Sequence, residues 1–162
     1  MAKMTISGLE ELELKLSKLG SMTEEVAKRV VIAGAQPVAD EIRKGLESLP
    51  IDNLKYLKSG DRFNVSPLGE VEDLKKSLGI TPPKVDNDGN INVKVGFDGY
   101  GSYPTKEYPK GHPNALIARA IESGSSVRQK KPFVRPAVSR SKKKALEEMK
   151  KIADEEVEII MK

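Results

Sequence analysis

The sequence contains no cysteine and a single histidine, His112. Without cysteine the chain can form no disulfide bond, no thiolate metal site and no thiol nucleophile. Catalytic triads and metal sites that need histidine together with other ligands lack their partners. Ser139 and Lys142 have the spacing of a Ser–Lys nucleophile, but the motifs that accompany it in known enzymes are missing. We therefore expect no enzyme, and no bound cofactor or metal.

Tryptophan is also absent, and aromatic residues make up 4% of the chain. The expected core is therefore aliphatic. No apolar run approaches the roughly 18 residues of a membrane-spanning helix, and the N-terminus lacks the apolar segment of a secretory signal. We expect a soluble protein made in a cytoplasm, without a membrane partner. With 162 residues, the chain is expected to form a single domain spanning 1–162.

The first third of the chain predicts helices. An S-x-x-E capping box at 7–10 begins a short helix that should end at Gly20. A second box at 21–24 opens a longer helix, which Pro50 closes. Pro37 lies inside this second helix, where its ring meets the carbonyl of the residue four positions earlier, so we expect a long, kinked helix.

The middle of the chain predicts a small antiparallel sheet. Alternation at 91–97 indicates a strand with one buried face, and the turn at 87–90 before it predicts a hairpin. Two prolines confine the preceding strand, at 78–85, to an edge or interrupt it. The stretch 50–69 reads mostly as loop, with a turn of helix around 53–58, and a short helix or strand entry follows it.

The last third predicts a short amphipathic helix at 115–122, a basic connector at 125–131, and a long amphipathic helix that begins between Phe133 and Ala137. The fold class is therefore α+β. The apolar positions of the closing helix recur at steps of mostly three and four, at Val134, Val138, Ala145, Met149, Ile152, Ala153, Val157, Ile160 and Met161.

Opposite charges are separated along the connector and the closing helix. The basic residues come first: Arg128, Lys130, Lys131, Arg135, Arg140, Lys142, Lys143 and Lys144. The acidic residues follow: Glu147, Glu148, Asp154, Glu155, Glu156 and Glu158. A helix dipole favours the reverse order, by ~0.3–1 kcal/mol for each charge near a terminus. The pattern indicates contact with a neighbouring subunit or with a polyanion such as DNA; the alternative is a solvated surface helix.

The loop at 98–113 is rich in glycine and proline and carries Tyr100, Tyr103 and Tyr108. A loop of this length without its own periodicity is often functional. Its tyrosines either contact a partner, through a flat apolar ring with a polar tip, or fold back over the sheet.

Three segments resemble a known family. They are Leu-Lys-Lys-Ser-Leu at 74–78, Glu-Ser-Gly-Ser at 122–125 and, most specifically, Pro-Phe-Val-Arg-Pro-Ala at 132–137. Their order is similar to that in the tail-completion or head–tail joining proteins of long-tailed bacteriophages, the family named after gene product ten of a lambdoid coliphage. The resemblance implies N-terminal helices, a small antiparallel sheet and a closing helix.

The resemblance also implies a role: a minor virion protein of a phage or prophage, synthesised in the bacterial cytoplasm and assembled where the tail meets the head. Its implied partners are other neck and tail proteins, such as the tail terminator and the connector or adaptor, and further copies of itself in a ring. Contact with viral DNA would be through the DNA backbone, because no base-reading motif is evident. The alternative is a freestanding basic DNA-binding accessory protein of a phage or prophage.

Overall fold

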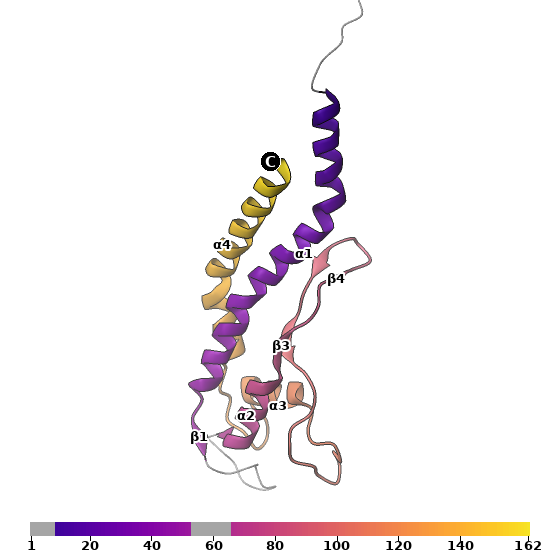
Figure 1. The fold of residues 1–162 in the computed structure, drawn as a ribbon. Helices are drawn as coiled ribbons and strands as arrows, with labels where there is room; N and C mark the ends of the chain where they lie inside the picture. The colour runs from indigo at the N-terminus through magenta and orange to yellow at the C-terminus, as the bar shows by residue number, and fades with distance from the viewer. Residues whose placement is uncertain (1–8, 53–65) are drawn as a thin grey trace, which may run out of the picture.

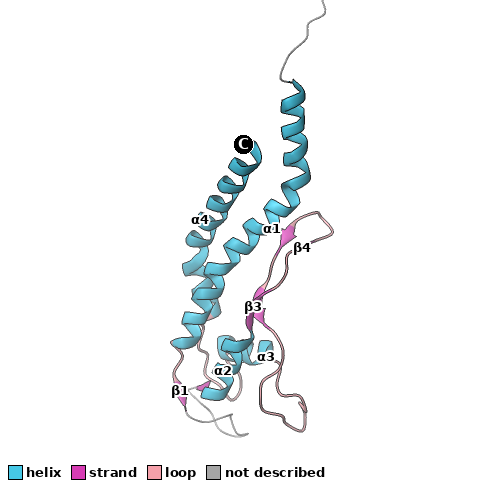
Figure 2. Ribbon diagram, viewed as in Figure 1, coloured by secondary structure: helices cyan, strands magenta, loops and turns pink. Residues whose placement is uncertain are grey.

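The computed structural model describes residues 9–52 and 66–162. Two long helices dominate it, α1 (Leu9–Glu47) and α4 (Val134–Met161), and they run side by side in opposite directions (Figure 1). Two short helices, α2 (Leu68–Ser77) and α3 (Asn114–Ser123), gather at one end of this pair. The fold class is α+β, as the sequence predicts, with short strands beside long helices (Figure 2).

One continuous helix, α1, stands where the sequence predicts two, so the predicted stop at Gly20 is wrong. A glycine inside a helix costs only about 1 kcal/mol, which does not force an end when the residues on both sides favour helix. The helix also continues through Pro37. Figure 1 shows α1 bent in the half nearer its N-terminus, whereas Pro37 lies in the other half, where packing against α4 opposes a kink.

Within residues 9–52 and 66–162, the strands form three pairs, and each strand is two or three residues long. Two pairs are antiparallel, β3 (Leu78–Ile80) with β6 (Val95–Phe97) and β4 (Lys84–Val85) with β5 (Ile91–Asn92). The third pair, β1 (Ile51–Asp52) with β2 (Ser66–Pro67), is parallel and was not expected. The helical turn predicted around 53–58 lies outside the described residues.

The two antiparallel pairs form one twisted hairpin, because Thr81 and Lys94 join them where the strands are interrupted. The Thr81 N–H donates to the Lys94 carbonyl (2.8 Å), and the Lys94 N–H donates to Thr81 Oγ1 (2.9 Å). The predicted turn is confirmed: the Asp86 carboxylate accepts the N–H of Asp88 and of Asn90, and Gly89 has a φ of 81°. The predicted strand at 91–97 is divided into β5 and β6, and its apolar side chains are half-buried while Asn92 and Lys94 are exposed.

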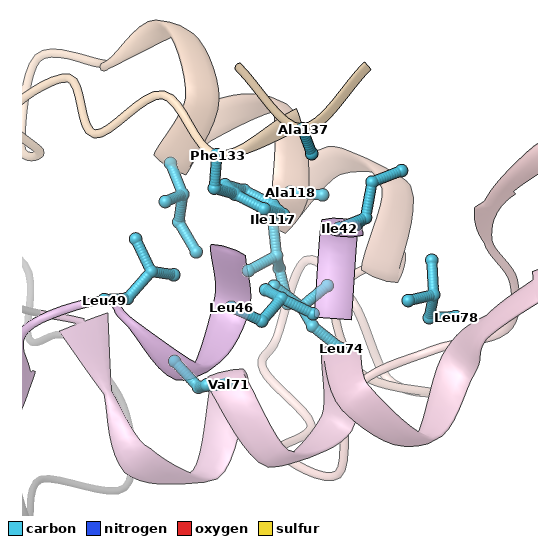
Figure 3. Packing of buried hydrophobic residues seen from close by; sticks show 11 residues of the cluster. Ile42, Leu46, Leu49, Val71, Leu74, Leu78, Ile117, Ala118, Phe133 and Ala137 are labelled. Carbon is cyan, nitrogen blue, oxygen red and sulfur yellow. The ribbon is translucent and has the colours of Figure 1, made fainter. Parts of the chain in front are cut away.

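The hydrophobic core lies where α2, α3 and β3 pack on the C-terminal end of α1 and the start of α4 (Figure 3). It is almost entirely aliphatic, as expected from the composition. Among the described residues, Phe133 is the one buried aromatic residue of this core, and its ring packs edge-to-face with Phe97 at a centroid distance of 6.0 Å. The buried members are Ile42, Leu46, Leu49, Val71, Leu74, Leu78, Ile117, Ala118, Ile121, Phe133 and Ala137.

Small residues allow α1 and α4 to approach closely. A Cβ atom on Gly34 would lie 2.5 Å from Met149 Cγ, and one on Gly45 would lie 3.0 Å from the Phe133 carbonyl oxygen. On α4, the buried positions are Ala137, Ser141 and Ala145. The contact therefore uses small side chains, which a search for large apolar residues passes over.

The predicted apolar stripe of α4 is only partly correct. Met149, Ile152 and Ile160 are half-buried, but Val138 and Val157 are 47% and 44% exposed. The buried residues Ala137 and Ser141 face α1, so the contact between the two helices is centred beside the predicted stripe and not on it. The predicted start of α4 is confirmed, at Val134. No helix in the described part of the chain is long and apolar enough to cross a membrane.

Candidate functional site

The predicted interface residues fall into four separate groups. The first is the connector, in which Arg128 is tied into the fold: its Nη2 donates to Glu70 Oε2, and both side chains are 11% exposed. Lys130, two residues on, is exposed, and Lys131 is half-buried. The Lys131 N–H donates to the Ile121 carbonyl (2.8 Å), which holds the connector against α3. The charge of Arg128 is therefore balanced inside the molecule, while Lys130 faces solvent.

The second group surrounds the start of α4, where Glu122 of α3 binds three backbone N–H groups. Its Oε2 accepts from Phe133 (2.7 Å) and Val134 (2.8 Å), and its Oε1 accepts from Arg135 (3.1 Å). These donors have no partner within the helix, and the helix dipole also favours a carboxylate there. Glu122 thus caps α4 from another helix.

This arrangement lowers the pKa of the Glu122 carboxyl. Burial alone would raise the pKa of its carboxyl, but the N–H groups of Val134, Phe133 and Arg135 act in the opposite direction and lower it overall. The structure brings together two of the segments that carry the family resemblance, 122–125 and 132–137. Sequence reasoning missed the role of Glu122, because nothing in the local pattern shows which helix end a distant carboxylate caps.

Arg135 and Arg140 have carboxylate partners at the surface. Arg135 Nε lies 3.9 Å from Glu122 Oε1, and its side chain is 74% exposed. Arg140 Nε donates to Glu41 Oε2 of α1 (3.1 Å). Farther along the same helix pair, Arg29 Nη1 donates to both oxygens of Glu156 (2.8 and 2.9 Å). Part of the charge on α4 therefore fixes its register against α1.

The third group is Lys142, Lys143 and Lys144, which are all exposed. Among the described side chains, Glu147 is the carboxylate within ion-pair distance of these lysines, with Oε1 3.9 Å from Lys143 Nζ. Farther along α4, Asp154, Glu155 and Glu158 are exposed as well. The separation of opposite charges predicted from the sequence therefore persists in part among the exposed residues of α4, because Lys150 and Lys151 are exposed between Glu147 and Asp154.

The fourth group is the tyrosine loop, residues 98–113, whose three tyrosines differ. Tyr100 is 58% exposed, and its backbone pairs with Pro113. The Tyr108 ring stacks at a tilt on His112, with centroids 4.3 Å apart. Tyr103 is half-buried and lines a cavity of about 230 Å³ with Glu70, Asp73 and His112, among others. Tyr100 is thus the tyrosine presented to solvent.

Polar contacts hold the tyrosine loop in place. Asp73 of α2 accepts the Ser102 N–H (2.7 Å) and the Ser102 hydroxyl (2.6 Å). The Gly101 N–H donates to the His112 carbonyl (2.8 Å), and Asn114 Nδ2 donates to the Asp98 carbonyl (2.8 Å). The carboxylate of Asp73 is thus already used by the loop. Within the described residues, no group of three or more His, Asp or Glu side chains could hold a metal ion.

Gly111→Ala is expected to destabilise this loop, and to lower the free energy of unfolding by about 1–3 kcal/mol. Gly111 has a φ of 92°, which an L side chain rarely adopts, and a Cβ there would overlap the Gly101 carbonyl oxygen. Urea unfolding measures the change. The control is Gly96→Ala, at a position with open space and no positive φ, which should change stability little. Equal effects of the two substitutions would contradict the tight Gly101–Gly111 approach.

Comparison with known proteins gives one match. Residues 10–108 match the model of the HK97-gp10-like family, which carries the description "Bacteriophage HK97-gp10, putative tail-component". The match covers more than half of the chain, from α1 to the tyrosine loop. The Pro-Phe-Val-Arg-Pro-Ala segment at 132–137 lies beyond it. No curated protein and no solved structure matches the chain.

Proposed function

The chain belongs to the HK97-gp10-like family of bacteriophage tail components, and from this premise we propose that it is a structural protein of the head–tail junction, where it completes the tail. Its role there is assembly through contacts between proteins, without catalysis and without a cofactor. The proposed partners are further copies of the chain in a ring, together with the neighbouring tail terminator and connector or adaptor proteins. Its proposed location is the virion, after synthesis in the bacterial cytoplasm.

The observation that carries this proposal is the exposed charge pattern of α4. Lys142, Lys143 and Lys144 are exposed in its first half, and Asp154, Glu155 and Glu158 are exposed in its second half. A protomer with a basic and an acidic region can bind a neighbour through two different surfaces, and such contacts close into a ring when the rotation allows. Complementary charge across these contacts favours correct partners over wrong ones.

We further propose that the exposed lysines contact viral DNA as it passes through the ring. Contacts between lysines and phosphates bind DNA without reading its sequence, and they weaken steeply as salt rises. This suits a passage that every part of a genome must cross. The tyrosine loop, with Tyr100 presented to solvent, is the proposed contact for a neighbouring neck protein.

Reversing the charge of Lys142, Lys143 and Lys144 to Glu should leave the protein folded and yield tailless heads or unjoined tails. The fold should survive because all three side chains are exposed. Circular dichroism checks the fold, and electron microscopy of particles made with the variant counts the joined ones. The matched control is the triple change of Lys76, Lys84 and Lys94 to Glu, three exposed lysines outside α4. A normal yield of joined particles from the α4 variant would contradict the proposal.

The second candidate, a freestanding DNA-binding accessory protein, is favoured by the same exposed lysines. The purified chain separates the two. A monomer that shifts duplex DNA with a steep salt dependence, and is missing from purified particles, would support the accessory protein. Detection of the chain in particles by mass spectrometry would support the tail role.

A further inference from the structure

A second apolar line runs along α4, beside the one that faces α1. Leu146, Val157 and Met161 are 57%, 44% and 46% exposed, and Ala153 lies between them. With Lys150, these residues follow one another at steps of four, three, four and four, so they share one face of the helix. Exposed apolar residues at helical spacing form a ridge that a second helix can bury. We call this ridge the outer face of α4.

Charged residues lie along one edge of the outer face in a fixed order. Lys143 and Lys150 come first, and Asp154 and Glu158 follow; all four are exposed. The positions of these four differ by seven, four and four residues, which keeps them along one side of the ridge. Glu147 lies on the same edge between the two lysines, with its Oε1 3.9 Å from Lys143 Nζ. Both lysines of this edge therefore precede Ala153, and two of its three carboxylates, Asp154 and Glu158, follow it.

We propose that the outer face binds the outer face of a second copy of this chain, with the two α4 helices antiparallel. A two-fold axis between Leu146 and Val157 places Leu146 of each copy against Val157 of the second copy. The same axis brings Lys143 near Glu158 of the second copy, and Lys150 near Asp154 of the second copy. Each contact occurs twice, because a two-fold interface uses the same patch on both chains.

The charge order selects this partner and this orientation. In a parallel pairing in register, Lys143 of one chain would lie beside Lys143 of the second chain, and the two Glu158 side chains would also lie together. Like charges at close range destabilise such a contact. Antiparallel pairing places opposite charges together at both ends. From Lys143 to Met161 the outer face is about 27 Å long, at 1.5 Å per residue. Since α1 already holds α4 as a helix, pairing does not have to order it.

This pairing goes beyond the proposed ring, because a two-fold contact is complete with two copies. It is a property of the free protein, and the proposed ring, which uses some of the same charged residues of α4, must replace it during assembly. A monomer at every concentration would overturn the pairing and leave the tail role, which is tested in particles, unaffected.

Cysteine cross-linking tests the orientation cleanly, because the natural chain has no cysteine. A mixture of the Leu146→Cys and Val157→Cys chains should form a disulfide between the two, since the pairing puts these positions opposite each other. Leu146→Cys alone should form little, because its two copies lie about 16 Å apart along the axis. Ala153→Cys alone should cross-link to itself, near the two-fold axis. Cross-linking of Leu146→Cys to itself, without the mixed product, would overturn the antiparallel arrangement.

Sedimentation tests the strength of the pairing. Leu146→Asp should weaken self-association at least about tenfold, because it places a charge in the buried ridge, directly opposite the apolar Val157 of the second copy. The control is Ile159→Asp: Ile159 is 67% exposed but lies on the opposite side of the helix from Val157, so its change should leave association unaltered. Equal weakening by both substitutions would overturn the assignment of the face.

Discussion

Phe133→Ala is expected to lower the free energy of unfolding by about 3–5 kcal/mol. Phe133 is 2% exposed and belongs to the core cluster, where its ring meets the edge of Phe97 at an interplanar angle of 61°. Removing it leaves a cavity where α1, α3 and the start of α4 meet, and also removes an aromatic pair worth about 0.5–1.5 kcal/mol beyond its buried area. The first turn of α4 would then lose its main apolar anchor.

Urea denaturation, followed by circular dichroism, measures this loss. The matched control is Tyr100→Ala, which removes an aromatic ring that is 58% exposed and should change the free energy of unfolding by no more than about 0.5 kcal/mol. A Phe133→Ala variant as stable as the Tyr100→Ala variant would show that the Pro-Phe-Val-Arg-Pro-Ala segment does not anchor α4.

Glu122→Ala is expected to cost about 2–4 kcal/mol at neutral pH. The substitution leaves the N–H groups of Phe133, Val134 and Arg135 without their acceptor, and Phe133 is buried, so water cannot fully replace the carboxylate there. Glu122→Gln keeps the size and one carbonyl oxygen but loses the charge, so an intermediate cost is expected. The control is Glu147→Ala, whose side chain is 64% exposed and lies 3.9 Å from Lys143; its removal should have little effect.

The pH dependence of stability identifies Glu122 as the cap. Its pKa is lowered in the folded protein, so the unfolded chain takes up this proton first as the pH falls. The stabilisation is present in full above the ordinary glutamate pKa of about 4.3, decreases below it, and is gone once the pH has passed the lower folded-state value. We expect a steeper loss of stability in this acid range for the natural chain than for Glu122→Ala. Parallel pH curves for the two proteins would contradict the cap.

Features with a short-range cause could be predicted from the sequence. The start of α4, the hairpin turn at Asp86–Asn90 and the short helix before Gly124 follow from proline, glycine and a few neighbouring residues. The stop predicted at Gly20 is wrong for the same local reason: a glycine and a capping box are compatible with a helix end, but they do not require one. Whether a helix continues through such a point depends on the total free energy of the longer helix.

For the candidate interface residues, too, the sequence predicts some features and the structure is needed for others. The separation of charge along α4 is visible in the sequence, but which charges face solvent is not. Arg128 and Arg140 meet Glu70 and Glu41, which are far away in the chain, whereas Lys142 meets no described carboxylate within ion-pair distance. Spacing along one helix gives the relative directions of its side chains, and only the position of α1 tells which of these directions is covered.

By itself, the sequence determined the fold class, the positions of most helices and the order of charges on the last one, because hydrophobic period, proline and glycine act within a few residues. The tertiary structure decided that Glu122 caps α4, that Gly34 and Ser141 lie in the α1–α4 contact, and that Leu146 and Val157 remain outside it. Each of these depends on two segments meeting across the fold. Such contacts depend on how whole surfaces pack together, and no local pattern specifies them.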